Sequence, residues 1–247
     1  MAEKVKPVQL KPETLQAFED HIREAEAAME RTLTGPDFLW CDGDAKRAKQ
    51  VREGKIIAGL WRGKNVIKAP SGLIHDWIGT VFVPGGDVSK TLALIQNYDN
   101  HKVVYQPEVI DSKLISREGD DFKIYLRVLK KKIITVVIDT DHDVHYFSLE
   151  PGRAGCRSRT TRAAEVDNAG KPDEKVEAPD SGYGFLWRLN TYWRFLERDG
   201  GVYLECRAIS LTRDIPLALR LIIEPIVRSL PREALIQTLA ATRRALV

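Results

Sequence analysis

Hydrophobic and polar residues alternate along the chain from residue 183 to residue 196. The odd positions are mostly aromatic or aliphatic, whereas the even positions include Arg188 and Arg194. An alternation with a period of two predicts a β-strand that buries one face. A hairpin turn at Asp199-Gly200 and a second alternating stretch at 202–211 extend the pattern. The two stretches therefore predict a pair of long antiparallel strands.

A long helix is predicted from Asp214 to Leu246. Asp214 is a favourable cap, and Pro216 is compatible with the first turn of a helix. The first half of this segment is apolar on almost every side, so it must be enclosed or contact a second apolar surface. Pro225 and Pro231 each remove a backbone donor, so we expect a kink or a restart there.

Strand and helix patterns cover most of the chain before residue 183. Alternating or β-branched stretches predict five further long strands, at 72–83, 109–116, 122–128, 133–149 and 155–166, and two short ones, at 55–61 and 65–69. Apolar residues spaced by three and four predict helices at 12–33, 44–53 and 86–99. The fold class is therefore α+β with seven long strands. Residues 1–70 are expected to form an N-terminal helical extension packed on a main domain of residues 71–247.

Composition and charge narrow the function classes. The chain has 247 residues with 38 basic and 35 acidic ones, and a net charge of +3 gives no reason to expect a nucleic acid or an anionic membrane as partner. No apolar run reaches the ~18 residues of a membrane span, so we expect a soluble protein. Met1–Lys6 lacks an apolar signal core, and the compartment stays open, either cytoplasmic or exported after loss of a leader. Cys41, Cys156 and Cys206 lack the spacing of a zinc site or a disulfide framework.

One acidic cluster suggests a metal site. Asp139, Asp141, Asp143 and Glu150 fall at the first, third, fifth and twelfth positions of a calcium-loop count. Val144 occupies the position where such a loop needs glycine, and the flanks are typical of strands. On a strand the aspartates would share one face without any metal. We therefore expect no metal.

A polar face runs along the predicted sheet. His75 and Asp76 are neighbours on one strand, so their side chains point to opposite faces and cannot form a catalytic pair. Other strands gather basic, acidic and phenolic side chains on one face, namely Lys123, Tyr125, Arg127, Arg157, Arg159, Arg188, Tyr192, Arg194, Glu205 and Arg207. The simplest interpretation is the convex, solvent-facing side of a curled sheet with cross-strand charge pairs. The alternative is a cavity wall that can clamp a carboxylate.

The order of elements resembles the helix-grip fold of the START-like lipid-transfer (SRPBCC) superfamily, which includes the birch pollen allergen and the polyketide cyclases. The resemblance rests on Gly72–Val83, Pro84–Asn100, and Tyr183–Val247 with its Asp-Gly-Gly turn and Asp214-Ile-Pro helix start, and it covers about residues 70 to 247. The segment Pro225–Glu233 is also similar to a segment of uncharacterised bacterial members. The resemblance implies a seven-stranded antiparallel sheet curled around the C-terminal helix, with an apolar cavity between them.

The resemblance and the apolar strand face together predict binding of a hydrophobic small molecule or lipid. Members of this superfamily bind lipids, sterols, polyketides or aromatic compounds, and some are cyclases or hydrolases. The expected ligand-binding residues are Phe122, Ile124, Leu126, Val136, Ile138, Phe185, Trp187, Leu189, Trp193, Val202, Leu204, Leu219, Ile222, Ile223 and Ile226. We expect no catalytic residue and no cofactor. Two alternatives stay open, a cyclase or aromatase acting in the same cavity and a scaffold whose N-terminal helix packs on a partner protein.

Overall fold

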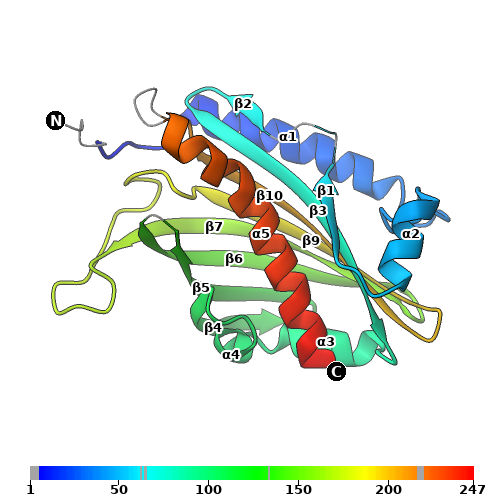
Figure 1. Cartoon of the computed structure of the whole chain (residues 1–247). Coiled ribbons are helices and arrows are strands. Elements are labelled where there is room, and N and C mark those ends of the chain that lie inside the picture. The colour runs from blue at the N-terminus through cyan, green and yellow to red at the C-terminus, as the bar shows by residue number, and fades with distance from the viewer. Residues whose placement is uncertain (1–5, 62, 64–65, 133, 216–219) are drawn as a thin grey trace.

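The computed structural model describes residues 6–61, 63, 66–132, 134–215 and 220–247, and of residues 220–228 the backbone alone. Its helices and strands follow the predicted order closely (Figure 1). In chain order they are α1 (Pro12–Glu30), α2 (Ala45–Arg52), β1 (Ile57–Leu60), β2 (Ile67–Ala69), β3 (Gly72–Pro84), α3 (Val88–Gln96), the 3-10 turn η1 (Tyr98–Asn100), α4 (His101–Val104), β4 (Val109–Glu118), β5 (Asp121–Lys131), β6 (Thr135–Glu150), β7 (Arg153–Asp167), β8 (Lys175–Val176), β9 (Arg188–Arg198), β10 (Gly201–Arg213) and α5 (Arg220–Leu246). Within the described ranges, no helix combines the length and the apolar character needed to cross a membrane.

One antiparallel sheet organises the molecule. Its strands follow the order β1-β3-β10-β9-β7-β6-β5-β4, and the short β2 and β8 pair with β3 and β7. The seven long strands correspond to the seven predicted ones, and three short strands bring the sheet to ten. α5 lies across one face of the curled sheet, and α1 packs on the other (Figure 1). This is the α+β helix-grip arrangement, so the predicted fold class is confirmed.

The contact between α5 and β3 holds the C-terminal helix inside the curl. Leu235 and Leu239 of α5 belong to one buried cluster with Trp77 of β3. A Cβ atom at Gly79 would lie 2.9 Å from Cδ1 of Leu239, which is closer than van der Waals contact allows. The absence of a side chain at position 79 therefore lets the helix rest directly on the strand.

The C-terminal helix is more regular than its prolines suggested. α5 continues without interruption from Arg220 to Leu246, so the restart expected at Pro231 does not occur. The lost backbone donor is tolerated because Leu235 and Leu239, in the turns that follow, are buried on the sheet. The helix was predicted to begin at Asp214, but Asp214 and Ile215 are not helical, and residues 216–219 lie outside the described residues.

The strand predicted from Tyr183 begins later, at Arg188. The carboxylate of Glu165 accepts hydrogen bonds from the backbone N–H groups of Tyr183 (2.8 Å) and Phe185 (3.0 Å), which ties this segment into a loop. Gly182 has a φ of +105°, outside the strand region. Alternation alone could not show this loop, because Tyr183 and Phe185 continue the aromatic pattern of the strand.

The first 70 residues contribute to the sheet as well as to its cover. β1 and β2 both pair with β3, so the sheet continues across residue 70. Phe18, Ile22 and Ala25 of α1 pack in a cluster with Ile74 of β3 and Ile209 of β10. The division into an extension and a main domain at this residue stays a prediction.

Charged side chains are buried beneath α1, which corrects the expectation that the polar face points to solvent. Arg207 is 2% exposed, and its guanidinium donates to both carboxylate oxygens of Asp76, at 2.8 and 2.6 Å. His21 of α1 lies 2.9 Å from the same carboxylate and donates to it. Burial alone would raise the pKa of Asp76, but these hydrogen bonds hold it below its ordinary value. The polar groups of β10 therefore anchor the N-terminal segment.

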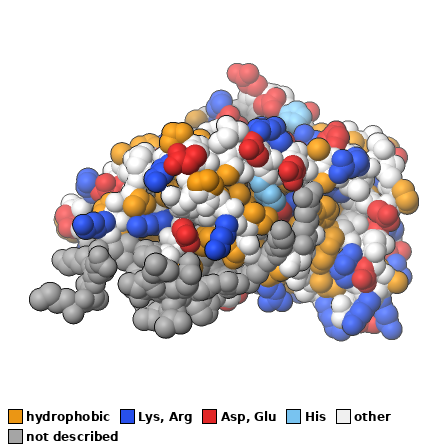
Figure 2. Space-filling view, turned by 90° about the horizontal axis from the view of Figure 1, so that it is seen from above, with side chains coloured by type: hydrophobic (Ala, Val, Ile, Leu, Met, Phe, Trp, Pro, Cys, Tyr) orange, Lys and Arg blue, Asp and Glu red, His pale blue; other side chains and the backbone are white. Residues whose placement is uncertain are grey.

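Exposed ion pairs add a further link between α1 and the sheet. Viewed from above, basic and acidic side chains are interspersed with apolar ones over the described surface (Figure 2). Arg157 and Arg159 of β7 reach Glu30 and Glu26 of α1, at 2.6 Å in each pair. Because such exposed pairs contribute at most ~1 kcal/mol each, the buried cluster and the Asp76 network dominate the attachment of α1.

Glu205 of β10 allows a test of this buried layer. Its side chain is 3% exposed and accepts hydrogen bonds from the backbone N–H of Trp40 (2.5 Å) and from Oγ1 of Thr80 (3.2 Å). Burial raises the pKa of this carboxyl from 4.5 to about 7, against the opposing attraction of Arg194. Between these pH values the folded chain holds a proton that the unfolded chain releases. The free energy of unfolding should therefore fall as the pH rises through this window.

Glu205→Gln should remove this contribution to the pH dependence. From the acid to the neutral end of this pH window, the wild type should lose up to about 3 kcal/mol of unfolding free energy that the variant does not lose. Urea unfolding measured across the window tests this, with Glu118→Gln at an exposed position as the control. A difference between wild type and Glu205→Gln that does not change with pH would contradict a buried, protonated carboxyl.

Candidate functional site

A cavity of about 1010 Å³ lies between the concave face of the sheet and α5. We call the concave strand face its floor and α5 its roof. The floor comes from β3, β10, β9, β7, β6 and β5, and the segment from Tyr98 to Val109 closes one side. Most of the lining side chains are apolar. The volume is at the upper end of the ~300–1,000 Å³ typical of small-molecule sites.

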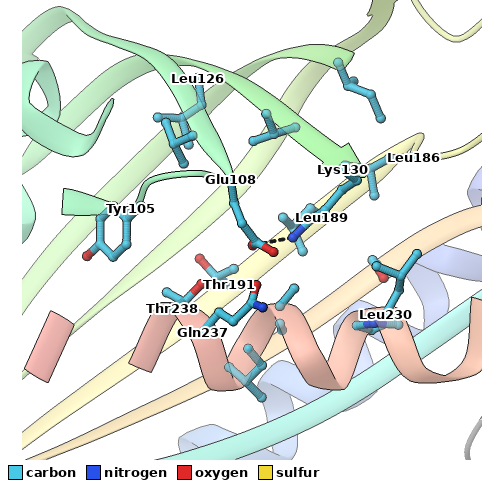
Figure 3. A pocket seen from close by; sticks show the side chains of 18 of the residues that line it. Tyr105, Glu108, Leu126, Lys130, Leu186, Leu189, Thr191, Leu230, Gln237 and Thr238 are labelled. Carbon is cyan, nitrogen blue, oxygen red and sulfur yellow. Dashed lines mark ion pairs between the residues drawn. The ribbon is translucent and has the colours of Figure 1, made fainter. Parts of the chain in front are cut away.

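The cavity reaches solvent near the turn between β5 and β6. Ile134 and Phe185 line it there and are 53% and 39% exposed. Glu108 and Lys130 also line the cavity and form an ion pair, which lies close to Gln237 of α5 (Figure 3). We call the end with Ile134 and Phe185 the mouth, and the opposite end the deep end.

Part of the predicted ligand-binding set lies in this cavity. The seven residues of the set that line it are Ile124, Leu126, Val136, Ile138, Phe185, Leu189 and Trp193. They come from β5, β6, β9 and the loop before β9, so the structure brings together side chains from distant parts of the chain. Their role in ligand binding stays a prediction.

The other predicted residues lie elsewhere or are not described. Phe122, Val202 and Leu204 pack in the buried cluster that includes the side chains of α3, beyond the deep end. Trp187 precedes β9 and packs in the cluster under α1. Leu219 lies outside the described residues, as do the side chains of Ile222, Ile223 and Ile226.

The cavity also contains polar side chains that the sequence interpretation missed. His142 and Tyr146 lie on β6 with the same parity as the predicted Ile138, so the alternation held a signal for them. Tyr98 and Tyr105 come from the turn and short helix before β4. No local pattern shows that this segment folds over the sheet.

The interior polar groups are largely uncharged. The hydroxyl oxygens of Tyr98 and Tyr146 lie 2.6 Å apart at the deep end. Burial raises the pKa of both phenols, so both stay protonated at neutral pH. Burial lowers the pKa of His142 to about 4, so its imidazole is neutral. These groups can exchange hydrogen bonds with a ligand but cannot neutralise a charge on it.

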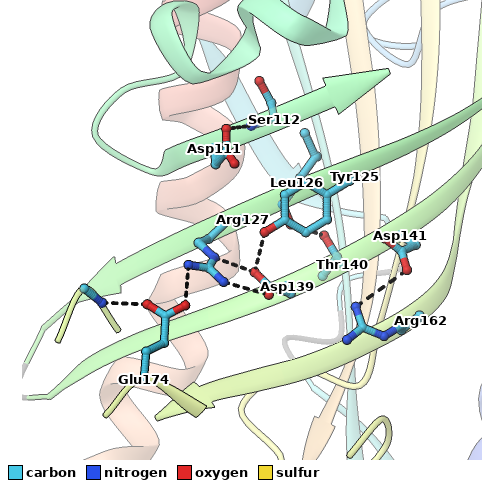
Figure 4. Close-up of polar contacts among 11 residues, drawn as sticks. Asp111, Ser112, Tyr125, Leu126, Arg127, Asp139, Thr140, Asp141, Arg162 and Glu174 are labelled. Carbon is cyan, nitrogen blue, oxygen red and sulfur yellow. Dashed lines mark hydrogen bonds and ion pairs between the residues drawn. The ribbon is translucent and has the colours of Figure 1, made fainter. Parts of the chain in front are cut away.

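The acidic side chains of β6 are balanced by cations on the neighbouring strands (Figure 4). Arg127 donates to Asp139 at 2.7 and 3.0 Å, and a nitrogen of Arg162 lies 3.6 Å from Asp141. Lys123 donates to Asp143 at 2.8 Å. The aspartates therefore need no metal to balance their charge. In the described portion of the chain, no group of three or more His, Cys, Asp or Glu side chains is arranged to hold a metal ion.

Comparisons with known proteins identify similar folds. Neither a family model nor a curated protein matches the sequence. A STAR-related lipid transfer protein from Xanthomonas axonopodis is 17% identical, with a TM-score of 0.47 over 73% of this chain and 97% of that chain. The Zhui aromatase/cyclase from a Streptomyces species is 13% identical, with a TM-score of 0.48 over 70% and 93%. Human STARD10 is 11% identical, with a TM-score of 0.45 over 81% and 79%.

These likenesses concern the fold. The chain has the START-like arrangement, a curled sheet around a C-terminal helix, that its order of helices and strands predicted. At these identities, and with TM-scores below 0.5, the solved structures carry no argument about function. A functional argument must therefore come from the cavity itself.

The tyrosine pair at the deep end provides a test of the site geometry. Tyr98→Phe should lower the free energy of unfolding by about 1–2 kcal/mol, because the Tyr146 hydroxyl loses its partner in a buried place. Adding Tyr146→Phe should cost less than its effect in the wild type, since the orphaned hydroxyl is then removed. A double-mutant cycle in urea measures this coupling. Strictly additive effects would show that the two hydroxyls do not interact.

Proposed function

We propose that this chain binds a hydrophobic small molecule or lipid in the cavity between the sheet and α5. The observation that carries the proposal is a cavity of about 1010 Å³ with a mostly apolar lining. Protein interiors are close-packed, and ordinary cores hold few voids larger than a water molecule. A space of this size with an opening to solvent matches the requirements of a ligand site.

The distribution of titratable groups favours binding over catalysis. His75 of β3 and His142 of β6 both line the cavity, but β10, β9 and β7 lie between their strands. At ~4.8 Å per strand their backbones stand about 19 Å apart along the curled sheet. Acid–base catalysis needs such groups to converge on one reacting atom. His101, Tyr98 and Tyr146 do meet at the deep end, where the rings of His101 and Tyr98 are 4.7 Å apart. Burial lowers the pKa of His101 to about 4 and raises the pKa of both phenols, so none of the three is tuned to exchange a proton near neutral pH. These shifts support a carrier or sensor more than a cyclase or aromatase.

The position of α1 counts against a scaffold role for the N-terminal helix. Thr14, Phe18, Ile22 and Ala25 form its buried face, and the last three pack on the outer side of the sheet of the same chain. A helix whose apolar face is already covered has little apolar surface left for a partner protein.

Filling part of the cavity should weaken binding. Ala208 lines the floor, so Ala208→Trp should weaken binding of pyrene, a fluorescent apolar probe, by about tenfold or more. Ala234→Trp in the roof should have a similar effect from the other side. Val103, which is 62% exposed and away from the cavity, provides the control Val103→Trp.

Pyrene emission titrations measure the dissociation constants, and thermal unfolding shows whether each variant folds. Mass spectrometry of an organic extract of the purified protein gives a second, probe-free measurement. If the wild type binds no pyrene and releases no hydrophobic compound, the proposal fails. It also fails if both folded cavity variants bind pyrene as tightly as the Val103→Trp control.

A further inference from the structure

A second, smaller pocket lies on the outer side of the sheet, on the face that α1 covers. It measures about 190 Å³, roughly six times the ~30 Å³ that one water molecule occupies in the liquid. Its floor comes from β3, β9 and β10, and its walls come from the end of α1, the segment that leads into α2, and Trp61 after β1. Most of its lining residues therefore lie before residue 70, outside the part of the chain that resembles the START-like superfamily.

Arg194 is a buried cation in the floor of this outer pocket, where it is 8% exposed. Its guanidinium donates to three neutral oxygens, those of the Thr32 hydroxyl and of the Met29 and Phe38 carbonyl groups. An arginine has five N–H donors, so the Nε–H group and one N–H of Nη2 have no acceptor among the described residues. Within the described ranges no carboxylate lies within ion-pair distance of this guanidinium. A buried charge is costly unless an opposite charge compensates it.

Glu205 does not supply that opposite charge. The register places it directly opposite Arg194 on the neighbouring strand, yet its Oε2 atom accepts hydrogen bonds from Trp40 and Thr80 instead. Burial raises the pKa of its carboxyl to about 7, with Arg194 opposing the rise and Asp42 adding to it. At neutral pH the carboxyl therefore keeps its proton in about half of the molecules.

The other charged residues of the lining are Asp37, Arg47 and Arg207. Arg207 is already neutralised by Asp76, at 2.8 and 2.6 Å. Arg47 lies 3.6 Å from Asp44, and its Nε–H group is buried without an acceptor in the described part of the chain. Asp37 is exposed, so water screens its charge. The pocket thus offers unused donors of two arginines and at most a partial negative charge on its buried floor.

Two tryptophans give the outer pocket an aromatic rim. Trp40 and Trp61 line it and are half-buried. The guanidinium groups of Arg47 and Arg207 lie over their rings, each 4.3 Å from the ring centroid. Stacking on an indole fixes the orientation of a guanidinium, so its donors are already in place. A planar ring can pack against these indoles while its polar group reaches the floor.

We propose that this outer pocket is a second binding site, for a small planar carboxylic acid bound as its anion. The carboxylate accepts the unused N–H groups of Arg194 and Arg47, and the ring packs against Trp40 and Trp61. Arginine presents a fork of N–H groups that matches a carboxylate. A cation would meet three guanidinium groups, and a neutral molecule would leave the charge of Arg194 uncompensated. The site is independent of the proposed function, because it lies on the other side of the sheet.

Three probes of one shape and different charge test this site. Benzoate is negative, benzamide is neutral and benzamidine is positive, and isothermal titration calorimetry at pH 7 measures their dissociation constants. The wild type should bind benzoate at least about tenfold more tightly than benzamide and should not bind benzamidine. Ala208→Trp, which fills part of the large cavity, should leave benzoate binding unchanged, because the probe occupies the outer pocket.

Two variants locate the anion. Arg47→Gln should weaken binding of benzoate by about tenfold and that of benzamide by less than about twofold. Arg52→Gln removes the same charge from an exposed position of α2 outside the pocket and is the matched control. Glu205→Gln should tighten benzoate binding by about fivefold at pH 8, where the wild-type carboxyl is ionised, and change it little at pH 6. Thermal unfolding shows that each variant is folded.

Several results would overturn this inference. Tightest binding of benzamidine would make Glu205 the centre of a cation site, and absence of benzoate binding at millimolar concentration would leave the pocket without its ligand class. Equal binding of benzoate by the wild type and Arg47→Gln, or its loss in Ala208→Trp, would place the probe elsewhere. The hydrophobic cavity stands in each of these cases, since pyrene binding tests it separately.

Discussion

The pairing of β3 with β10 is buried on both faces, and the rest of the structure depends on how each face is covered. On the inner face Gly79 lets α5 rest on β3, and α5 makes its main sheet contact there. The helix therefore lies over one part of the sheet and not over its centre. The strands from β9 to β5 curl away from it, and the cavity occupies the space between them. The same contact thus closes the core and creates the candidate site.

Covering the outer face imposes a different requirement. A charge buried between α1 and the sheet needs a partner, and Asp76 has two, Arg207 and His21. His75, the residue before it, points to the other face and lines the cavity. One dipeptide therefore serves both layers, with its histidine in the ligand space and its aspartate in the attachment of α1. The alternation that ruled out a catalytic pair explains this division of roles.

Alternation along the strands was sufficient to predict the sheet, its long strands and the face of most strand side chains. It failed at Trp187, which precedes β9 and packs under α1 and not in the cavity. Alternation could not predict how far along each strand the cavity extends before the packed core begins. Trp193 and Leu204 share a face, yet Trp193 lines the cavity while Leu204 packs in the core beyond the deep end. Nor could alternation predict which strand residues are buried by segments that are distant in the sequence. Arg207 has the spacing of an exposed strand residue, and the helix that buries it contacts it at Ala25, which is 182 positions away.

Trp193 gives the molecule a built-in optical reporter. The chain has five tryptophans, and Trp193 is the one that lines the cavity. Trp77 and Trp187 are buried but are not among the lining residues, and Trp40 and Trp61 lie on the outer side near Arg47 and Arg207. The register places Cys156 and Cys206 on either side of Trp193, so its indole has a polarisable sulfur on each flank. A change in its emission would therefore report the filling of the cavity against a steady background from the other four indoles.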